Sequence, residues 1–142
     1  MDRELILHKE IDLIQDCIKR MASNSFLIKG WMLSISGIIL AIVFNKDVAN
    51  VYPATWIVAV IILSFWYLDA HFLRIERMFR KLYSWVIENR KTSEEYMYDL
   101  NPQRFENNVA SLWVVMWSDT LWIFYFIPLM AIVIINAIKY FA

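Results

Sequence analysis

The sequence has few residues that interrupt helices and nothing with which to build a disulfide framework. Its 142 residues include two glycines, three prolines and one cysteine. With so few helix breakers, the chain is expected to form long continuous elements. The single cysteine, Cys17, excludes an internal disulfide, and it lies among apolar residues at helical spacing, so we expect it to pack in a helix interface.

Charge is also scarce. Charged residues make up 20% of the chain, with 14 basic and 14 acidic side chains, whereas 60% is hydrophobic and 16% is aromatic. A soluble domain of this length has too little interior to bury that much apolar surface. Because backbone groups inside lipid must pair within their own segment, the composition predicts an all-α membrane protein. The charged residues 1–25 contain no apolar run, so no cleaved signal peptide is expected.

The first two apolar runs predict two membrane spans, of which only the first has the length of a full span. Residues 26–44 have the length of an ordinary span, but residues 55–68 are too few for a hydrocarbon core of about 30 Å, which needs about 20 helical residues. The second span is therefore expected to cover residues 54–73, passing through Asp69 and His71. The membrane should end near Arg74, while the helix continues to about residue 90.

The rest of the chain predicts a connection and a third span. Residues 91–108 are polar, and Thr92 or Ser93 could cap a short helix there. Asn101 followed by Pro102 is typical of the start of another helix, which would lead into the membrane. Residues 109–142 are too few for two spans and are expected to form an interfacial segment and span 3, with Pro128 inside it. No repeat or linker divides the chain, so residues 1–142 are predicted to be one membrane domain.

The distribution of Lys and Arg predicts the orientation. Residues 1–29 hold five of these cations and residues 74–104 hold seven, whereas the loop 44–55 holds only Lys46 and the C-terminus only Lys139. Loops rich in Lys and Arg stay in the cytosol. We therefore expect a bacterial inner-membrane protein with a cytosolic N-terminus and a periplasmic C-terminus.

Two apolar seams predict a cytosolic stalk. The amphipathic helix 1–25 and the continuation of the second span each carry apolar residues at alternating spacings of three and four, typical of one buried helix face. A spanning hairpin would bring the two helices together, antiparallel, beneath the membrane. The alternative is that either helix lies flat on lipid as an anchor. Glu76 and Arg80 are spaced to pair on the second helix. The seams comprise Leu7, Ile11, Ile14, Ile18 and Met21, and Leu68, Phe72, Ile75, Phe79, Leu82 and Val86.

Small residues line one face of the first span. They recur at spacings of four, three and four, which lets two membrane helices approach closely, either within the chain or between subunits. These residues are Gly30, Ser34, Gly37 and Ala41.

Lys29 and Asp69 lie at matching depth in the hairpin formed by the first two spans. They are expected to meet near the cytosolic boundary. Alternatively, Lys29 extends alone to the interface and Asp69 reaches water.

The sequence offers no set of residues for catalysis. It has no Gly-rich phosphate loop, no Cys/His spacing for a metal, and no nucleophile with a base and an orienting group. We therefore expect no enzyme, no cofactor and no metal site, and no sequence-specific binding of nucleic acid. A charge-lined transport path would need several ionisable groups deep in the spans, which are nearly free of them.

In size and layout, with a helix that leaves the membrane at "YLDAHFLRIERMFRKLY", the chain resembles small membrane effectors of bacterial anti-phage systems. These include Hailong-type channel subunits, two-span effectors encoded beside nucleotide-signalling enzymes, and the membrane accessory protein of type VI CRISPR loci. The resemblance implies a homo-oligomeric pore in lipid, shut until a cytosolic nucleotide, oligonucleotide or protein trigger reaches the stalk. No site residue is carried over from these families. The alternative function is a non-conducting scaffold or regulator that recruits a cytosolic partner protein.

Overall fold

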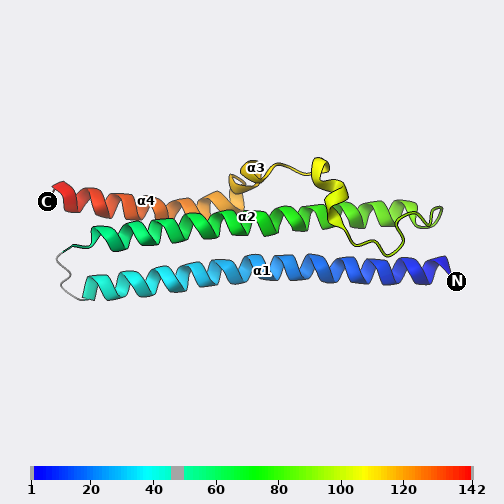
Figure 1. The fold of residues 1–142 in the computed structure, drawn as a ribbon, viewed down its shortest axis with the longest axis horizontal. Helices are drawn as coiled ribbons and strands as arrows, with labels where there is room; N and C mark the ends of the chain where they lie inside the picture. The colour runs from blue at the N-terminus through cyan, green and yellow to red at the C-terminus, as the bar shows by residue number, and fades with distance from the viewer. Residues whose placement is uncertain (1, 46–49, 142) are drawn as a thin grey trace.

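The computed structural model describes residues 2–45 and 50–141, and in this part of the chain all regular structure is helical (Figure 1). Two long helices, α1 (Arg3–Asn45) and α2 (Tyr52–Asn89), are followed by the 3-10 helix η1 (Pro102–Asn108), the short helix α3 (Leu112–Met116) and α4 (Asp119–Phe141). By length and composition α1, α2 and α4 can each cross a membrane. The chain is an all-α membrane protein, as its composition predicts.

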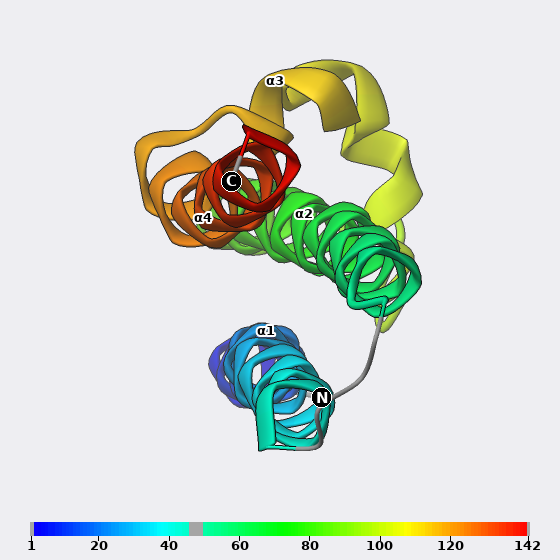
Figure 2. The same cartoon turned by 90° about the vertical axis from the view of Figure 1, so that its left-hand side faces the viewer.

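Of the three long helices, α1 and α4 both pack against α2. Helices α1 and α2 run antiparallel along their whole length, and α4 covers only the half of α2 that begins at Tyr52 (Figures 1 and 2). Helices α1 and α4 contact each other through long side chains. The ammonium group of Lys29 in α1 lies 5.9 Å from the ring centre of Phe124 in α4, and the ammonium group of Lys139 in α4 lies 5.1 Å from the ring centre of Phe44 in α1. The parts of α1 and α2 beyond α4 form a two-helix stalk.

Helix α2 is continuous from the membrane half into the stalk. A proline lies in its first turn, where a missing N–H costs nothing, and no glycine or proline follows before Pro102. The third apolar run is divided as expected into a short lead-in helix, α3, and one span, α4, with Pro128 inside that span.

The connection after α2 differs from the prediction. No helix starts at Thr92 or Ser93; the segment forms turns, in which the Ser93 hydroxyl accepts a hydrogen bond from the Glu95 N–H at 3.1 Å. Tyr96 and Tyr98 have φ values of 54° and 57°, so no α-helix can run through them. Arg90 imposes this path, because its side chain binds carbonyl groups of the same segment.

The capping role of Asn101 is confirmed, but its helix is short. The Asn101 side chain accepts a hydrogen bond from the Gln103 N–H at 3.0 Å, and Pro102 begins the helix η1. This helix ends at Asn108, and Val109 is extended with φ −121° and ψ 157°. The expected continuous helix from Pro102 into the third span is therefore wrong.

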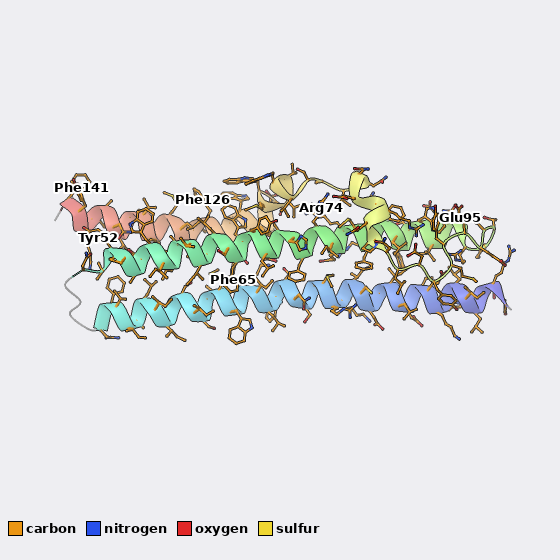
Figure 3. The ribbon with its side chains drawn as sticks, in the orientation of Figure 1. Tyr52, Phe65, Arg74, Glu95, Phe126 and Phe141 are labelled. Atoms are coloured by element: carbon orange, nitrogen blue, oxygen red, sulfur yellow. The ribbon has the colours of Figure 1, made fainter. Side chains whose placement is uncertain are left out.

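The buried side chains form two clusters, one in each half of the molecule. The first joins α1, α2, α3 and α4 around Met32, Ile62, Trp66 and Tyr125. The second joins α1 and α2 in the stalk around Ile14 and Leu82. Phe141, which is 85% exposed, projects from the end of α4 (Figure 3), whereas Phe65 of α2 packs against the first cluster.

Candidate functional site

Asp69 is the centre of a polar network inside the membrane half. Its side chain is fully buried, and Lys29 Nζ of α1 lies 2.5 Å from its Oδ2 atom. The structure thus brings together the two charges whose depth the sequence predicts to match. Lys29 also donates to the Ser25 hydroxyl at 2.9 Å, and that hydroxyl donates to Asp69 Oδ1. The Tyr125 hydroxyl of α4 donates to Asp69 Oδ2 at 2.8 Å.

This network neutralises the carboxylate and joins all three spans. A buried charge is costly unless it is paired and hydrogen-bonded, and both oxygens of Asp69 have partners. Sequence reasoning missed Ser25 and Tyr125. Ser25 could have been found, because it lies one helical turn before Lys29 and therefore on the same face. Tyr125 gave no such signal, since aromatic residues are frequent along α4.

Trp66 fixes the junction between α3 and α4. Its indole N–H donates to the Met116 carbonyl at 2.9 Å, and its ring stacks on Tyr125 at a centroid distance of 6.1 Å. At the other end of the spans, the Thr55 hydroxyl donates to Asn136 Oδ1 at 2.9 Å. Helix α4 is therefore tied to α2 by polar contacts near both of its ends.

The two stalk seams bury each other. Most of the seam residues lie in the second cluster, together with Cys17, so the faces that could have anchored either helix on lipid are occupied. The Glu76–Arg80 pair is present at 2.6 Å. Buried seam residues are Leu7, Ile14, Phe79, Leu82 and Val86; half-buried ones packed on them are Ile11, Ile18, Met21 and Ile75.

The seam on α2 begins later along the chain than the sequence predicts. Phe72 is half-buried and lies outside the cluster, and Leu68 is 40% exposed. At this level Asp69 occupies the side of α2 that meets α1, where it binds Ser25 and Lys29. Leu68, as its neighbour in sequence, points away from that contact.

A second buried ion pair closes the tip of the stalk. Arg90 and Glu10 are each only 2% exposed, with Arg90 Nε 2.5 Å from Glu10 Oε2 and Nη2 3.0 Å from Oε1. The other N–H groups of Arg90 donate to the carbonyls of Ser93, Glu95 and Tyr96 at 3.0, 2.9 and 3.3 Å. All five donors of the guanidinium are satisfied.

Glu10 also accepts from the backbone N–H of Tyr98 at 2.7 Å, so the pair organises the loop that follows α2. Sequence reasoning missed this site, although a signal was present. Glu10 lies three residues after Leu7 and four before Ile14, and Arg90 lies four after Val86, so both charges fall in the apolar seams. Charges placed in register with a seam are expected to pair.

The stripe of small residues takes no part in packing within the chain. Ile28, Met32 and Ser36 are the buried side of α1 in this region, whereas Gly30, Ser34, Gly37 and Ala41 are exposed on the other side. A Cβ atom added to Gly30 or Gly37 would meet nothing within 4 Å. Of the two roles that the sequence left open, contact within the chain is excluded for these residues.

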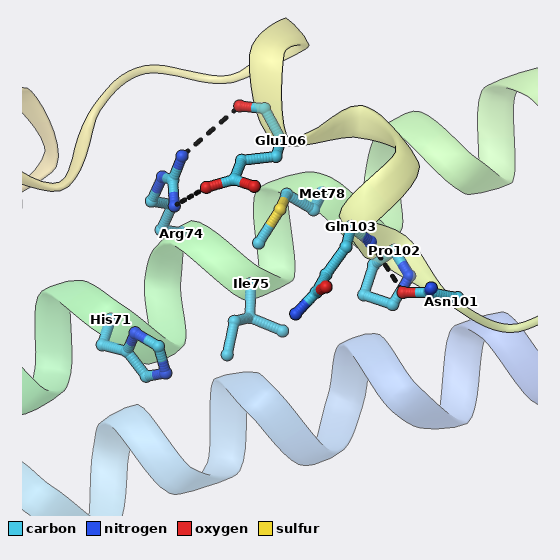
Figure 4. Close-up of a pocket in the computed structure, with 8 residues that line it drawn as sticks. All are labelled: His71, Arg74, Ile75, Met78, Asn101, Pro102, Gln103 and Glu106. Carbon is cyan, nitrogen blue, oxygen red and sulfur yellow. Dashed lines mark hydrogen bonds and ion pairs between the residues drawn. The ribbon is translucent and has the colours of Figure 1, made fainter.

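A cavity lies where the stalk meets the membrane half, between α2 and η1 (Figure 4). Its volume is about 330 Å³, near the lower limit for pockets that bind small ligands. Arg74 and Glu106 pair at 3.5 Å on one side of it, so its main charges compensate each other. The lining residues are His71, Arg74, Ile75, Met78, Asn101, Pro102, Gln103 and Glu106.

Within residues 2–45 and 50–141, no three His, Cys, Asp or Glu side chains are placed together to hold a metal ion. No protein-family model, curated protein or solved structure matches the chain. What the arrangement can do must therefore be argued from its geometry.

Proposed function

We propose that the chain is one subunit of a homo-oligomeric pore in the bacterial inner membrane, opened by a cytosolic signal that acts on the stalk. The observation that carries this proposal is the continuity of α1 and α2, which pass from stalk to membrane without a break. At 1.5 Å per residue, their 43 and 38 residues correspond to about 65 and 57 Å. Only about 30 Å of that length can lie in hydrocarbon.

Such helices can transmit movement. The stalk seams are packed along their length, the Glu10–Arg90 pair ties their ends together, and the Asp69 network ties both helices to α4. Because packed helices are stiff, a change of tilt at the stalk tip must move the membrane ends of α1 and α2. A nucleotide, an oligonucleotide or a protein that binds the stalk could supply that change.

A pore requires several copies, since the spans of one chain pack around α2 and leave no central path. The exposed stripe on α1 offers a face where a second copy can approach closely. Opening such a pore in the inner membrane would let ions flow down their gradients and would depolarise the membrane. Resemblance in layout to anti-phage membrane effectors supports a defensive role for that activity.

A second candidate is a non-conducting scaffold that recruits a cytosolic partner protein through the stalk. It is favoured by two polar contacts inside the spans, Asp69 with Lys29 and Asn136 with Thr55, which turn these side chains toward the chain's own interior. A wide aqueous pore would need a polar lining. A hydrophobic constriction that gates by dewetting would not, and that is the kind of pore we propose.

Overproduction in bacteria tests the proposal, with membrane potential followed by a voltage-sensitive dye. We expect the wild-type protein to depolarise cells and Gly37→Leu, which adds bulk to the contact face, to abolish the effect at equal membrane content. Gly37→Ala is the matched control, because it keeps a small residue and should still depolarise. If the membrane potential stays unchanged when the wild-type protein is produced at a high level, the result would contradict the pore and support the scaffold function.

A further inference from the structure

A basic pocket lies next to the cavity of Figure 4, on the stalk just beyond the expected membrane boundary. Its volume is about 290 Å³, and α2 contributes Arg77, Arg80 and Lys81, while the other side is formed by Asn108 at the end of η1 and by the next two residues, Val109 and Ala110. Arg80 is neutralised by Glu76 at 2.6 Å. Within the described part of the chain, Arg77 and Lys81 form no ion pair, so the pocket carries two uncompensated positive charges.

The wall opposite α2 is held in place by Arg74. Its Nε donates to the Ala110 carbonyl at 3.1 Å and its Nη2 to the Glu106 carbonyl at 3.4 Å. The same segment then enters α3, in which Trp113 is 71% exposed, and Trp117, the residue directly after α3, is 57% exposed. Exposed indoles at the end of a span are typical of the membrane interface, so the pocket and these rings lie next to one lipid layer.

The two cations are directed toward the headgroups. Arg77 and Lys81 lie about 4.5 and 10.5 Å beyond Arg74 along the helix axis, and the headgroup layer is about 5 to 7.5 Å thick on each side. Side chains on a helix lean toward its N-terminus, and the N-terminus of α2 lies at the far side of the membrane. Both long side chains therefore lean back toward the lipid, where their charges can reach a phosphate.

We infer that this pocket binds the phosphate of an anionic phospholipid, with Arg77 and Lys81 as the charged ligands and Trp113 and Trp117 anchoring α3 beside the lipid. The chemistry is that of a phosphate group, and the position of the pocket at the headgroup layer identifies lipid as its source. Arg offers paired N–H groups to phosphate oxygens, and the Asn108 amide adds a neutral donor. Because η1 and α3 connect the stalk to α4, bound lipid would hold this connection against α2.

The test is a titration of purified protein in neutral detergent with anionic phospholipid, and separately with zwitterionic phospholipid of the same acyl chains. Binding is followed by the rise in unfolding temperature. We expect the anionic lipid to bind more tightly, and the variant Arg77→Gln/Lys81→Gln to bind it about 25-fold more weakly, at about fivefold for each charge. The control variant Lys9→Gln/Lys19→Gln removes two exposed cations of α1 and should bind the anionic lipid as the wild type does.

Two further measurements, a competition with glycerol phosphate and a charge-preserving variant, complete the test. Glycerol phosphate should not compete at concentrations where the lipid saturates; equal competition would identify a free phosphate as the ligand and overturn the lipid assignment. The charge-preserving variant Arg77→Lys/Lys81→Arg should bind normally. If the Gln variant fails to fold, the wild-type affinity for anionic lipid must still fall steeply with salt. Equal binding of both lipids, or equal loss in the Lys9 and Lys19 control, would also overturn the inference.

Discussion

Arg90 at the end of α2 and Glu10 near the start of α1 meet at the tip of the stalk, where they form a two-point ion pair that is almost completely buried. The remaining donors of Arg90 hold three carbonyls of the loop that follows, and Glu10 accepts the N–H of Tyr98 in that loop. One ion pair thus fixes the register of the stalk helices and the path of the chain as it leaves α2.

Removing Arg90 should destabilise the stalk strongly. Arg90→Leu leaves the Glu10 carboxylate buried without a cation, and breaking a buried pair in this way costs about 3 to 5 kcal/mol. We expect a clear fall in the unfolding temperature and faster proteolysis of residues 91–100. The double variant Glu10→Leu/Arg90→Leu should recover only part of the loss, because the loop carbonyls still lack donors. A loss no larger than that of the exposed control Lys91→Leu would show that the pair is unimportant.

The Lys29–Asp69 pair should behave as one coupled unit. Lys29→Asp or Asp69→Lys places two like charges in contact inside the protein and should lower the folded yield. The double exchange should restore part of it, as expected for residues in direct contact. Lys19→Asp, on the exposed face of α1, serves as the control and should have little effect. Additive losses in the double variant would contradict the pairing.

Tyr125 should stabilise the packing of α4 through its hydroxyl. Tyr125→Phe keeps the stacked ring but removes one of the donors to the buried Asp69 carboxylate. Hydrogen bonds to charged groups contribute about 1.5 to 3 kcal/mol, so the unfolding temperature should fall measurably. Tyr140→Phe, at a side chain that is 77% exposed, should leave it unchanged.

The sequence predicted the features that depend on local periodicity. The three long apolar helices, the antiparallel stalk and the depth match of Lys29 with Asp69 all follow from spacing along single helices. It did not predict the loop 91–100, because the left-handed backbone of Tyr96 and Tyr98 is unfavourable for such residues. That conformation depends on Arg90 and on Glu10, which is 80 residues away in sequence. The contact of Tyr125 with Asp69 likewise depends on how α4 docks, which no local pattern encodes.

The orientation can be tested by reporter fusions. A periplasmic reporter should be active when fused at residue 50 or after residue 141, and a cytosolic reporter when fused at residue 95. The physical reason is the concentration of Lys and Arg in residues 1–29 and 74–104. A cytosolic C-terminus would mean that the proposed orientation, or the single passage of α4, is wrong.

Ion flux through liposomes that contain only the purified protein tests the pore most directly. Protein reconstituted at a density that favours oligomers should release a potassium gradient, and chemical cross-linking of the same liposomes should capture multiples of one chain. Gly37→Leu should remove both the flux and the cross-linked multiples, whereas Gly37→Ala should keep both. Because the proposed pore opens when a signal acts on the stalk, the measurement is repeated with the stalk loosened by Arg90→Leu, which should raise the flux. Liposomes that stay sealed with the wild type and with Arg90→Leu, although both proteins are folded and inserted, would contradict the account.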